Sequence, residues 1–223
     1  MAFRRKPVKL QDCVEHGPES GAELFLVEGD SASSSVGKVC SERFQAVLPM
    51  QGKPLNAIKS SVARVQANEL LGELTRALGA GTGDAFDVRA LRFQRVLLLM
   101  DPDADGIHCG ALMLMFFYRF MPAMFDQERL LMVRAPLFRI TSDRLAKPAF
   151  VSSKAHREQV VAQLEENAAE YEIQHYRGLG SLEESLMRTR CVDPATRSAD
   201  IMKREDAESA IRVFSASSLP DDQ

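Results

Sequence analysis

Short runs of apolar residues alternate along the chain with segments whose apolar residues recur at helical spacing. The runs that resemble strands cover residues 23–27, 44–48, 96–100, 130–133, 137–140 and 171–176. Several of them are continuously apolar, which is typical of strands buried on both faces. Strands that alternate with helices predict an α/β sandwich with a mostly parallel sheet flanked by helices.

Capping residues mark the expected helices. Asn68 is expected to cap a helix whose leucines share one face and which ends at Gly79. Residues 108–120 are apolar nearly all round, which predicts a buried helix. Three further helices are expected, one after the serine run 33–35, one capped by Ser153 and one that begins with a capping box of Ser181 and Glu184. A last helix is expected at about residues 206–214.

Acidic residues follow two of the apolar runs at the point where each run ends. Residues 96–100 lead into Asp101, Asp103 and Asp105, and residues 23–27 lead into Glu28. Ligands of open α/β sheets bind beyond the carboxyl ends of the strands, so we expect both acidic turns at one edge. Crowded carboxylates repel one another unless a cation joins them, and hard oxygen ligands suit Mg²⁺ or Mn²⁺. The sequence therefore predicts a divalent metal site.

Three other motifs are disfavoured by position. An EF-hand loop that began at Asp101 would need a glutamate at its twelfth position, where Leu112 stands. A dehalogenase-type phosphatase would carry its D-x-D after the first strand, whereas this one follows the third expected strand. Gly37 and Lys38 lack the earlier glycine and the following Ser or Thr of a Walker A loop.

Composition narrows the class of protein further. The chain has 223 residues, of which 45% are hydrophobic, and its net charge of −3 gives no global basic signature for nucleic acid. No C-x-x-C pair occurs among the cysteines, so neither a zinc site nor a redox motif is predicted. We expect no signal peptide and no transmembrane helix, and hence a cytoplasmic or nucleoid-associated protein.

The same pattern divides the chain into four expected parts. Residues 1–21 are a polar N-terminal arm, residues 22–142 an α/β core, residues 143–217 a C-terminal part and residues 218–223 a disordered tail. No internal repeat is found.

A series of motifs resembles, in the same order, the TOPRIM region of the B subunits of bacterial type IIA DNA topoisomerases, gyrase and topoisomerase IV. The motifs are residues 23–32, 44–56, 101–108, 116–119, 136–138, 176–180 and 193–197. The resemblance extends from about residue 9 to residue 214. It implies a TOPRIM Rossmann-like fold with a small C-terminal helical extension.

The resemblance also implies a chemistry, namely Mg²⁺-assisted cleavage and religation of DNA. In that family the acids at the positions of Glu28, Asp101 and Asp103 are catalytic metal ligands, and Asp105 would be a nearby ligand. Three further residues are implied to bind DNA, namely Lys53, His108 and Arg177.

The same family implies partners for the chain. DNA is one expected partner. A gyrase A-type or topoisomerase IV A-type subunit is the other, because Tyr118, Tyr171 and Tyr176 do not resemble the cleavage tyrosine. No ATP site is expected here, since no nucleotide-binding glycine loop is found. These features favour a topoisomerase (isomerase) active site completed by a partner subunit. A homodimer stays open.

Several positions depart from the family pattern, and they keep two alternatives open. Ser33–Ser35 stand where the family usually has Gly-Gly-Ser, Gln51 stands where a cation is usual, and Cys109 begins a changed stretch after His108. One alternative is a stand-alone metal-dependent nuclease in which metal-bound water replaces the tyrosine. The other is a non-catalytic module that interacts with DNA or gyrase.

Overall fold

The computed structural model describes residues 9–216 of the chain. The first eight residues of the expected arm and the expected tail at 218–223 lie outside the described residues. Within the described range, no helix combines the length and the apolar character that crossing a membrane requires.

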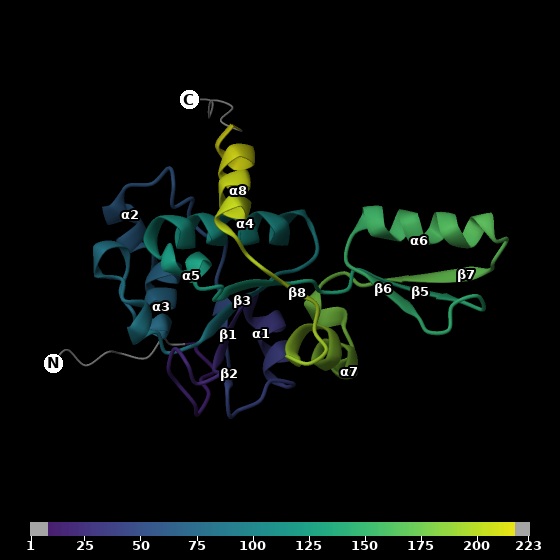
Figure 1. The fold of residues 1–223 in the computed structure, drawn as a ribbon, viewed down its shortest axis with the longest axis horizontal. Coiled ribbons are helices and arrows are strands. Elements are labelled where there is room, and N and C mark those ends of the chain that lie inside the picture. The colour runs from purple at the N-terminus through teal and green to yellow at the C-terminus, as the bar shows by residue number, and fades with distance from the viewer. Residues whose placement is uncertain (1–8, 217–223) are drawn as a thin grey trace.

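A five-stranded sheet forms the centre of the molecule (Figure 1). Its strands are β1 (Glu23–Glu28), β2 (Gln45–Met50), β3 (Arg95–Leu99), β4 (Leu130–Val133) and β8 (Ala199–Ile201). The strand order is β2-β1-β3-β4-β8, with the first four strands parallel and β8 antiparallel to β4. The expected α/β fold with a mostly parallel sheet is confirmed.

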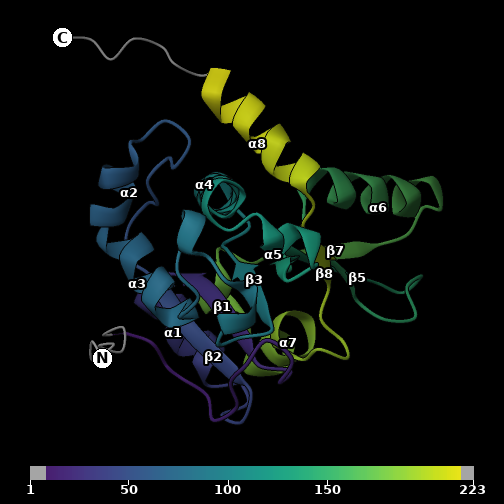
Figure 2. The same ribbon diagram turned by 60° about the vertical axis from the view of Figure 1, so that its left-hand side comes forward.

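Helices cover both faces of this sheet (Figures 1 and 2). The helices beside the sheet are α1 (Gly29–Gly37), α2 (Val62–Ala67), α3 (Glu69–Leu78), α4 (Ala104–Phe120), α5 (Ala123–Asp126) and α7 (Glu184–Met187), whereas α8 (Arg204–Ala216) packs against α4. Short helical turns are η1 (Gly83–Ala85), η2 (Val88–Ala90), η3 (Leu179–Ser181) and η4 (Arg188–Val192).

The strands of the sheet supply two separate cores because successive side chains of a strand point to opposite faces. Leu24 and Leu26 of β1 join the cluster that contains the buried residues of α3 and several of those of α4. Phe25 and Val27 join the cluster that contains Val36 of α1 and the buried residues of α7 and η4. Burial on both faces explains why residues 24–27 of β1 and residues 96–99 of β3 are continuously apolar in sequence.

A second, smaller sheet extends from one side of the molecule, with α6 (Lys154–Glu166) packed on it (Figure 1). It has the antiparallel order β6-β5-β7, formed by β5 (Phe138–Ser142), β6 (Ala149–Val151) and β7 (Tyr171–His175). The segments 130–133 and 137–140 are thus two strands in different sheets. The boundary expected between residues 142 and 143 lies at the end of β5, and the division into domains stays a prediction.

The local expectations for helix starts are partly confirmed. Asn68 accepts a hydrogen bond from the Leu71 N–H at 3.1 Å, and Gly79 ends α3 with φ +72°. Ser153 caps α6 by accepting from the His156 N–H at 3.2 Å. The buried helix α4 begins at Ala104, four residues before its expected start, because Asp103 caps it.

Three local expectations are wrong. Serines 33–35 cap no helix, because α1 already begins at Gly29. Ser181 does not cap α7, which begins after Glu183; its hydroxyl donates to the Gly178 carbonyl at 2.7 Å within η3, and this local bond competes with capping. The strand expected at residues 44–48 continues through Pro49 to Met50, since an edge strand tolerates a residue without an N–H.

Candidate metal centre

The two acidic turns meet at one edge of the central sheet, as expected. β1 and β3 are parallel neighbours with Val27 opposite Leu99, so both chains leave the sheet at the same edge. Glu28 is the last residue of β1, and Asp101 follows the end of β3. Asp103 caps α4 by accepting from the Gly106 N–H at 2.8 Å, and Asp105 lies in the first turn of that helix.

Glu28 is a half-buried carboxylate that lacks compensation by a cation. Its Oε1 accepts a hydrogen bond from Cys109 Sγ at 3.5 Å, whereas its buried Oε2 has no partner among the described residues. Burial raises the pKa of Glu28, and the three nearby aspartate charges raise it further, against the opposing effect of the thiol hydrogen bond. A buried carboxylate oxygen without a donor is unfavourable unless a cation or a proton meets it.

Asp101 is held by a turn from a distant part of the chain. The Leu179 N–H donates to Asp101 Oδ1 at 2.7 Å. Burial raises the pKa of Asp101, the Leu179 hydrogen bond lowers it, and the charge of Asp103 raises it. Two glycines allow this packing: a Cβ at Gly106 would lie 2.0 Å from the Asp101 carbonyl oxygen, and a Cβ at Gly178 would lie 3.2 Å from both carboxylate oxygens.

The residues expected to bind DNA all lie beside the acids, in different states. Lys53 Nζ pairs with Asp105 Oδ1 at 3.1 Å. The His108 ring stacks on Phe214 with centroids 4.6 Å apart, and burial and then the Lys53 charge lower its pKa against the opposing Asp105 charge, which favours the neutral ring. Arg177 is exposed and directly precedes Gly178, which touches Asp101.

Comparison with known proteins identifies the part of the chain that carries these acids. Residues 23–131, from β1 to β4, match the Toprim domain family. These residues form a Toprim domain. The four acids therefore lie on one Toprim edge, at the carboxyl ends of β1 and β3.

The similarity extends beyond the Toprim domain. The chain is 38% identical over 217 residues to the DNA gyrase B subunit of Thermotoga maritima, covering 93% of this chain and 32% of that protein. It is 35% identical over 209 residues to the protein of that name from Archaeoglobus fulgidus and 36% identical over 211 residues to the one from Treponema denticola, covering 94% of this chain each time. The chain spans about a third of the length of these relatives.

The donor set of the Toprim edge fits a hard divalent cation. All four acids offer carboxylate oxygens, the pKa values of Glu28 and Asp101 are raised, and one buried oxygen lacks a partner. The carboxylate oxygens of the four acids are not close enough together to form a ready metal site. Among the described residues, three ligand atoms lie within 4.8 Å of one another only in a group elsewhere in the molecule. Cation binding at the Toprim edge therefore calls for side-chain rotation or for bridging water, which Mg²⁺ commonly retains.

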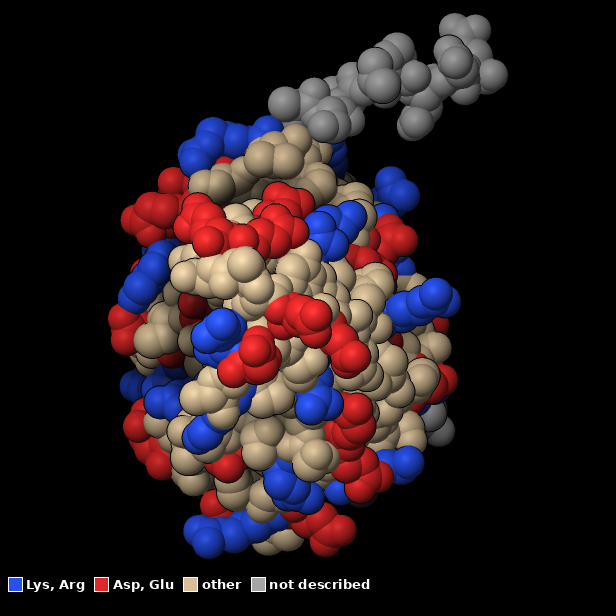
Figure 3. All heavy atoms as spheres, turned by 90° about the vertical axis from the view of Figure 1, so that its right-hand side faces the viewer, with Lys and Arg blue, Asp and Glu red and all other residues tan. Residues whose placement is uncertain are grey.

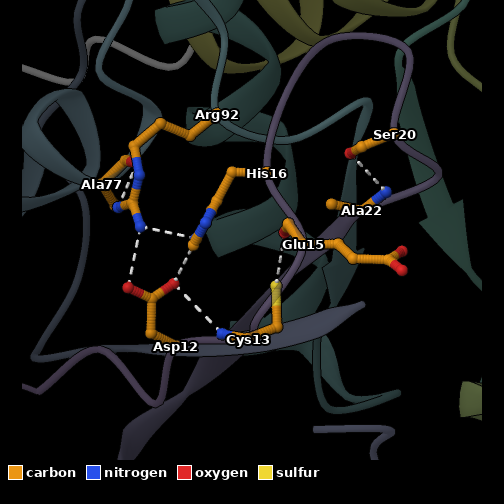
Figure 4. Close-up of polar contacts among 8 residues, drawn as sticks. All are labelled: Asp12, Cys13, Glu15, His16, Ser20, Ala22, Ala77 and Arg92. Carbon is orange, nitrogen blue, oxygen red and sulfur yellow. Dashed lines mark hydrogen bonds and ion pairs between the residues drawn. The ribbon is translucent and has the colours of Figure 1, made fainter. Parts of the chain in front are cut away.

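That other group consists of Asp12, Cys13 and His16, and it does not suit a metal (Figure 4). Arg92 Nη2 lies 2.7 Å from Asp12 Oδ2 and 2.7 Å from His16 Nε2, so a cation already occupies the cluster. Cys13 Sγ donates to the Glu15 carbonyl at 3.1 Å, and burial raises the pKa of this thiol to about 11. The cluster attaches the segment before β1 to the loop before β3.

Sequence reasoning missed two groups that touch the acids, namely the Cys109 thiol and the Leu179 N–H. Cys109 is visible in the sequence only as a departure from the family pattern after His108. A backbone N–H carries no side-chain signal, so Leu179 could be found only through the G-L-G turn in which it stands.

Charge is mixed on the face of the molecule that the smaller sheet presents. Figure 3 shows Lys and Arg side chains interspersed with Asp and Glu on this face. This distribution agrees with the net charge of −3. The face in Figure 3 therefore presents no extended basic surface for a nucleic acid.

Proposed function

We propose that this Toprim domain binds Mg²⁺, or Mn²⁺ in its place, and contributes the metal-binding half of a type II DNA topoisomerase active site. Glu28 and Asp101 would hold one cation, Asp101 and Asp103 would share a second, and Asp105 lies beside it. The observation that supports this most is the meeting of the four acids at one edge, with an unpartnered Glu28 oxygen, in a chain similar to DNA gyrase B subunits over most of its length.

When bound, a divalent cation would supply Lewis-acid stabilisation of the leaving sugar oxygen and of the charge on the phosphoryl group. The chain's own residues would transfer a proton and bind the DNA phosphates. Glu28 lies at the strand end, where it can return a proton to the leaving oxygen. Lys53 and Arg177 would bind DNA phosphates, and His108, as a neutral ring, would donate one hydrogen bond to a phosphate oxygen.

The nucleophile is proposed to come from a partner of the gyrase A type. Two of the three tyrosines of the chain have hydrogen-bonded hydroxyls, since Tyr118 donates to Glu208 at 3.2 Å and Tyr171 donates to Glu165 at 2.7 Å, and the third, Tyr176, is buried at 1% exposure. DNA is the proposed substrate.

A cleavage assay tests this proposal. The protein is mixed with a gyrase A-type subunit, supercoiled DNA and Mg²⁺, and covalent protein–DNA complexes are trapped with detergent. Asp103→Asn removes the charge but keeps a good helix cap, and we expect it to trap roughly 10²-fold less DNA than the wild type. Asp143→Asn, at a 72% exposed acid of the smaller sheet, is the matched control.

Other outcomes of the same assay point away from the proposal. Equal trapping by Asp103→Asn and Asp143→Asn would show that the acids are not the metal site. DNA nicking by the protein alone would indicate the metal-dependent nuclease. Tight binding to the A-type subunit without trapping, unchanged by Glu28→Gln, would indicate a non-catalytic module.

A further inference from the structure

A turn outside the matched Toprim residues reaches the Toprim edge that carries the four acids. Residues 177–180 come shortly after β7 of the smaller sheet and include the start of η3. Leu179 is fully buried in the cluster that contains Val27 and Leu99, the residues that precede the two acidic turns on β1 and β3. Gly180 approaches α1 so closely that a Cβ there would lie 3.2 Å from Ser31 Oγ. The turn is therefore packed against the elements that carry the acids.

Gly178 fits this place for two independent reasons. Its φ of +146° lies in a region that residues with a side chain rarely adopt. A Cβ at Gly178 would also crowd Asp101, at 3.2 Å from Oδ1 and 3.2 Å from Oδ2. The absence of a side chain lets the next N–H, that of Leu179, donate to Oδ1 at 2.7 Å.

We propose that Gly178 and Leu179 are positioning residues for the metal ligand Asp101. The Leu179 N–H fixes the rotation of the carboxylate through Oδ1. No donor from the described residues meets Oδ2, and this oxygen is left to face a cation. This inference rests on the proposed metal site. It adds that metal affinity is set in part by a turn that lies beyond residue 131.

The smaller sheet is connected to the site through the same turn. The Tyr176 N–H donates to the Leu137 carbonyl at 2.9 Å, so the last bond of the β5–β7 ladder directly precedes the turn. Coupling between two sites is reciprocal. Cation binding at Asp101 therefore stabilises the turn, and displacement of the turn lowers the affinity of Asp101 for the cation.

The first test compares three glycine variants of the purified chain by calorimetric titration with MnCl₂ and MgCl₂. Gly178→Ala should lower the affinity for the cation at least about tenfold, which is the usual effect of losing a group that orients a metal ligand. Gly180→Ala is the control for crowding, because its Cβ would meet Ser31 and not Asp101. Gly21→Ala is the control for backbone strain, since Gly21 has φ +82° with no atom within 4 Å of the added Cβ. Both controls should bind within about twofold of the wild type.

The second test needs no change in the turn. Amide hydrogen exchange at Leu179 is measured in the wild type, in Asp101→Ala and in Asp143→Ala. If Asp101 accepts the bond, the exchange of the Leu179 amide accelerates at least about tenfold in Asp101→Ala alone. MnCl₂ should slow the exchange in the wild type. An unchanged rate in Asp101→Ala overturns the proposal even if Gly178→Ala fails to fold.

The two proposals fail in different ways. If Asp101→Asn binds Mn²⁺ as tightly as the wild type, the proposed metal site itself is wrong. If Asp101→Asn loses the cation while Gly178→Ala binds like Gly180→Ala, the metal site stands and the positioning role is wrong.

Discussion

β1 carries a glutamate at each end, and the two side chains have opposite environments. Glu23 is 3% exposed, and Arg197 donates to its Oε2 at 2.7 Å, with Gln45 Nε2 at 3.0 Å from the same oxygen. Glu28 has only the Cys109 thiol and an unpartnered oxygen. A buried ion pair with its hydrogen bonds satisfied is typical of a structural role, whereas a half-buried acid without a counter-charge is a candidate for a functional site.

The unpaired acid predicts a pH dependence of stability in the metal-free protein. Burial raises the pKa of Glu28 above its ordinary value of 4.5, so the folded chain binds more protons than the unfolded chain from about that pH upward. The stability that this group contributes is present below pH 4.5 and is lost as the pH rises through the raised pKa. Asp101 acts in the same direction.

Glu28→Gln should therefore stabilise the metal-free protein at neutral pH, by an amount of the order of 1 kcal/mol. Thermal melts in EDTA between pH 4.5 and 8 measure it, and the slope against pH should flatten in the variant. Added Mg²⁺ should raise the melting temperature of the wild type more than that of Glu28→Gln. A variant less stable than the wild type in EDTA would show that the charge of Glu28 is compensated in the folded chain.

At the scale of elements, α4 links the acidic turn to the core. Asp103 caps the helix, and the segment that follows is buried on nearly every side. Gly106 in its first turn lies against the Asp101 backbone, where an added Cβ would be 2.0 Å from the carbonyl oxygen and 2.9 Å from the backbone N. Backbone atoms cannot move aside as the end of a long side chain can. The turn that presents the acids therefore depends on this glycine.

Replacement of two helical glycines by alanine should thus change the free energy of unfolding in opposite directions. Gly106→Ala should destabilise the protein by about 1–3 kcal/mol, because it overpacks the acidic turn. Gly72→Ala in α3 meets only the end of the Arg76 side chain, at 3.3 Å, and should gain up to about 1 kcal/mol from helix propensity. Urea unfolding measures both. A gain in Gly106→Ala would show that the turn at Asp101 has room for a side chain.

At the scale of the whole molecule, residues 9–216 form one large sheet with a core on each face and one small sheet with its own core. Its buried residues are Leu137, Phe138, Ile140, Val151 and Leu164. Four of the five residues of β7 are exposed, whereas β1 and β3 lie between two clusters. The smaller sheet therefore has less buried surface to resist local opening.

Native-state hydrogen exchange should separate the two sheets. Amides of β1 and β3 should exchange only through global unfolding, whereas amides of β5 and β7 should exchange faster, with a smaller dependence on denaturant. Leu179, next to the smaller sheet, is expected to become more protected when Mg²⁺ is present. Equal protection of both sheets would show that they unfold as one cooperative unit.

Much of the fold could be read from the sequence where the signal is local. The apolar run before Asp101 indicated a strand buried on both faces, and Asn68 with Gly79 marked both ends of α3. The caps at Ser33–Ser35 and Ser181 were wrong because a serine hydroxyl has several backbone partners, and only the folded chain decides between them. Whether the acids bind metal stays a prediction.

The sequence by itself determined that strands alternate with helices and that acids follow β1 and β3, because periodicity and strand ends are local properties. Only the tertiary structure decided which acid is neutralised. Arg197, 174 positions after Glu23, pairs with that glutamate and leaves Glu28 without a cation. The tertiary structure alone also brought the Leu179 N–H, 78 positions after Asp101, to its carboxylate. A backbone N–H is the same at every residue, so only the fold can assign it a partner.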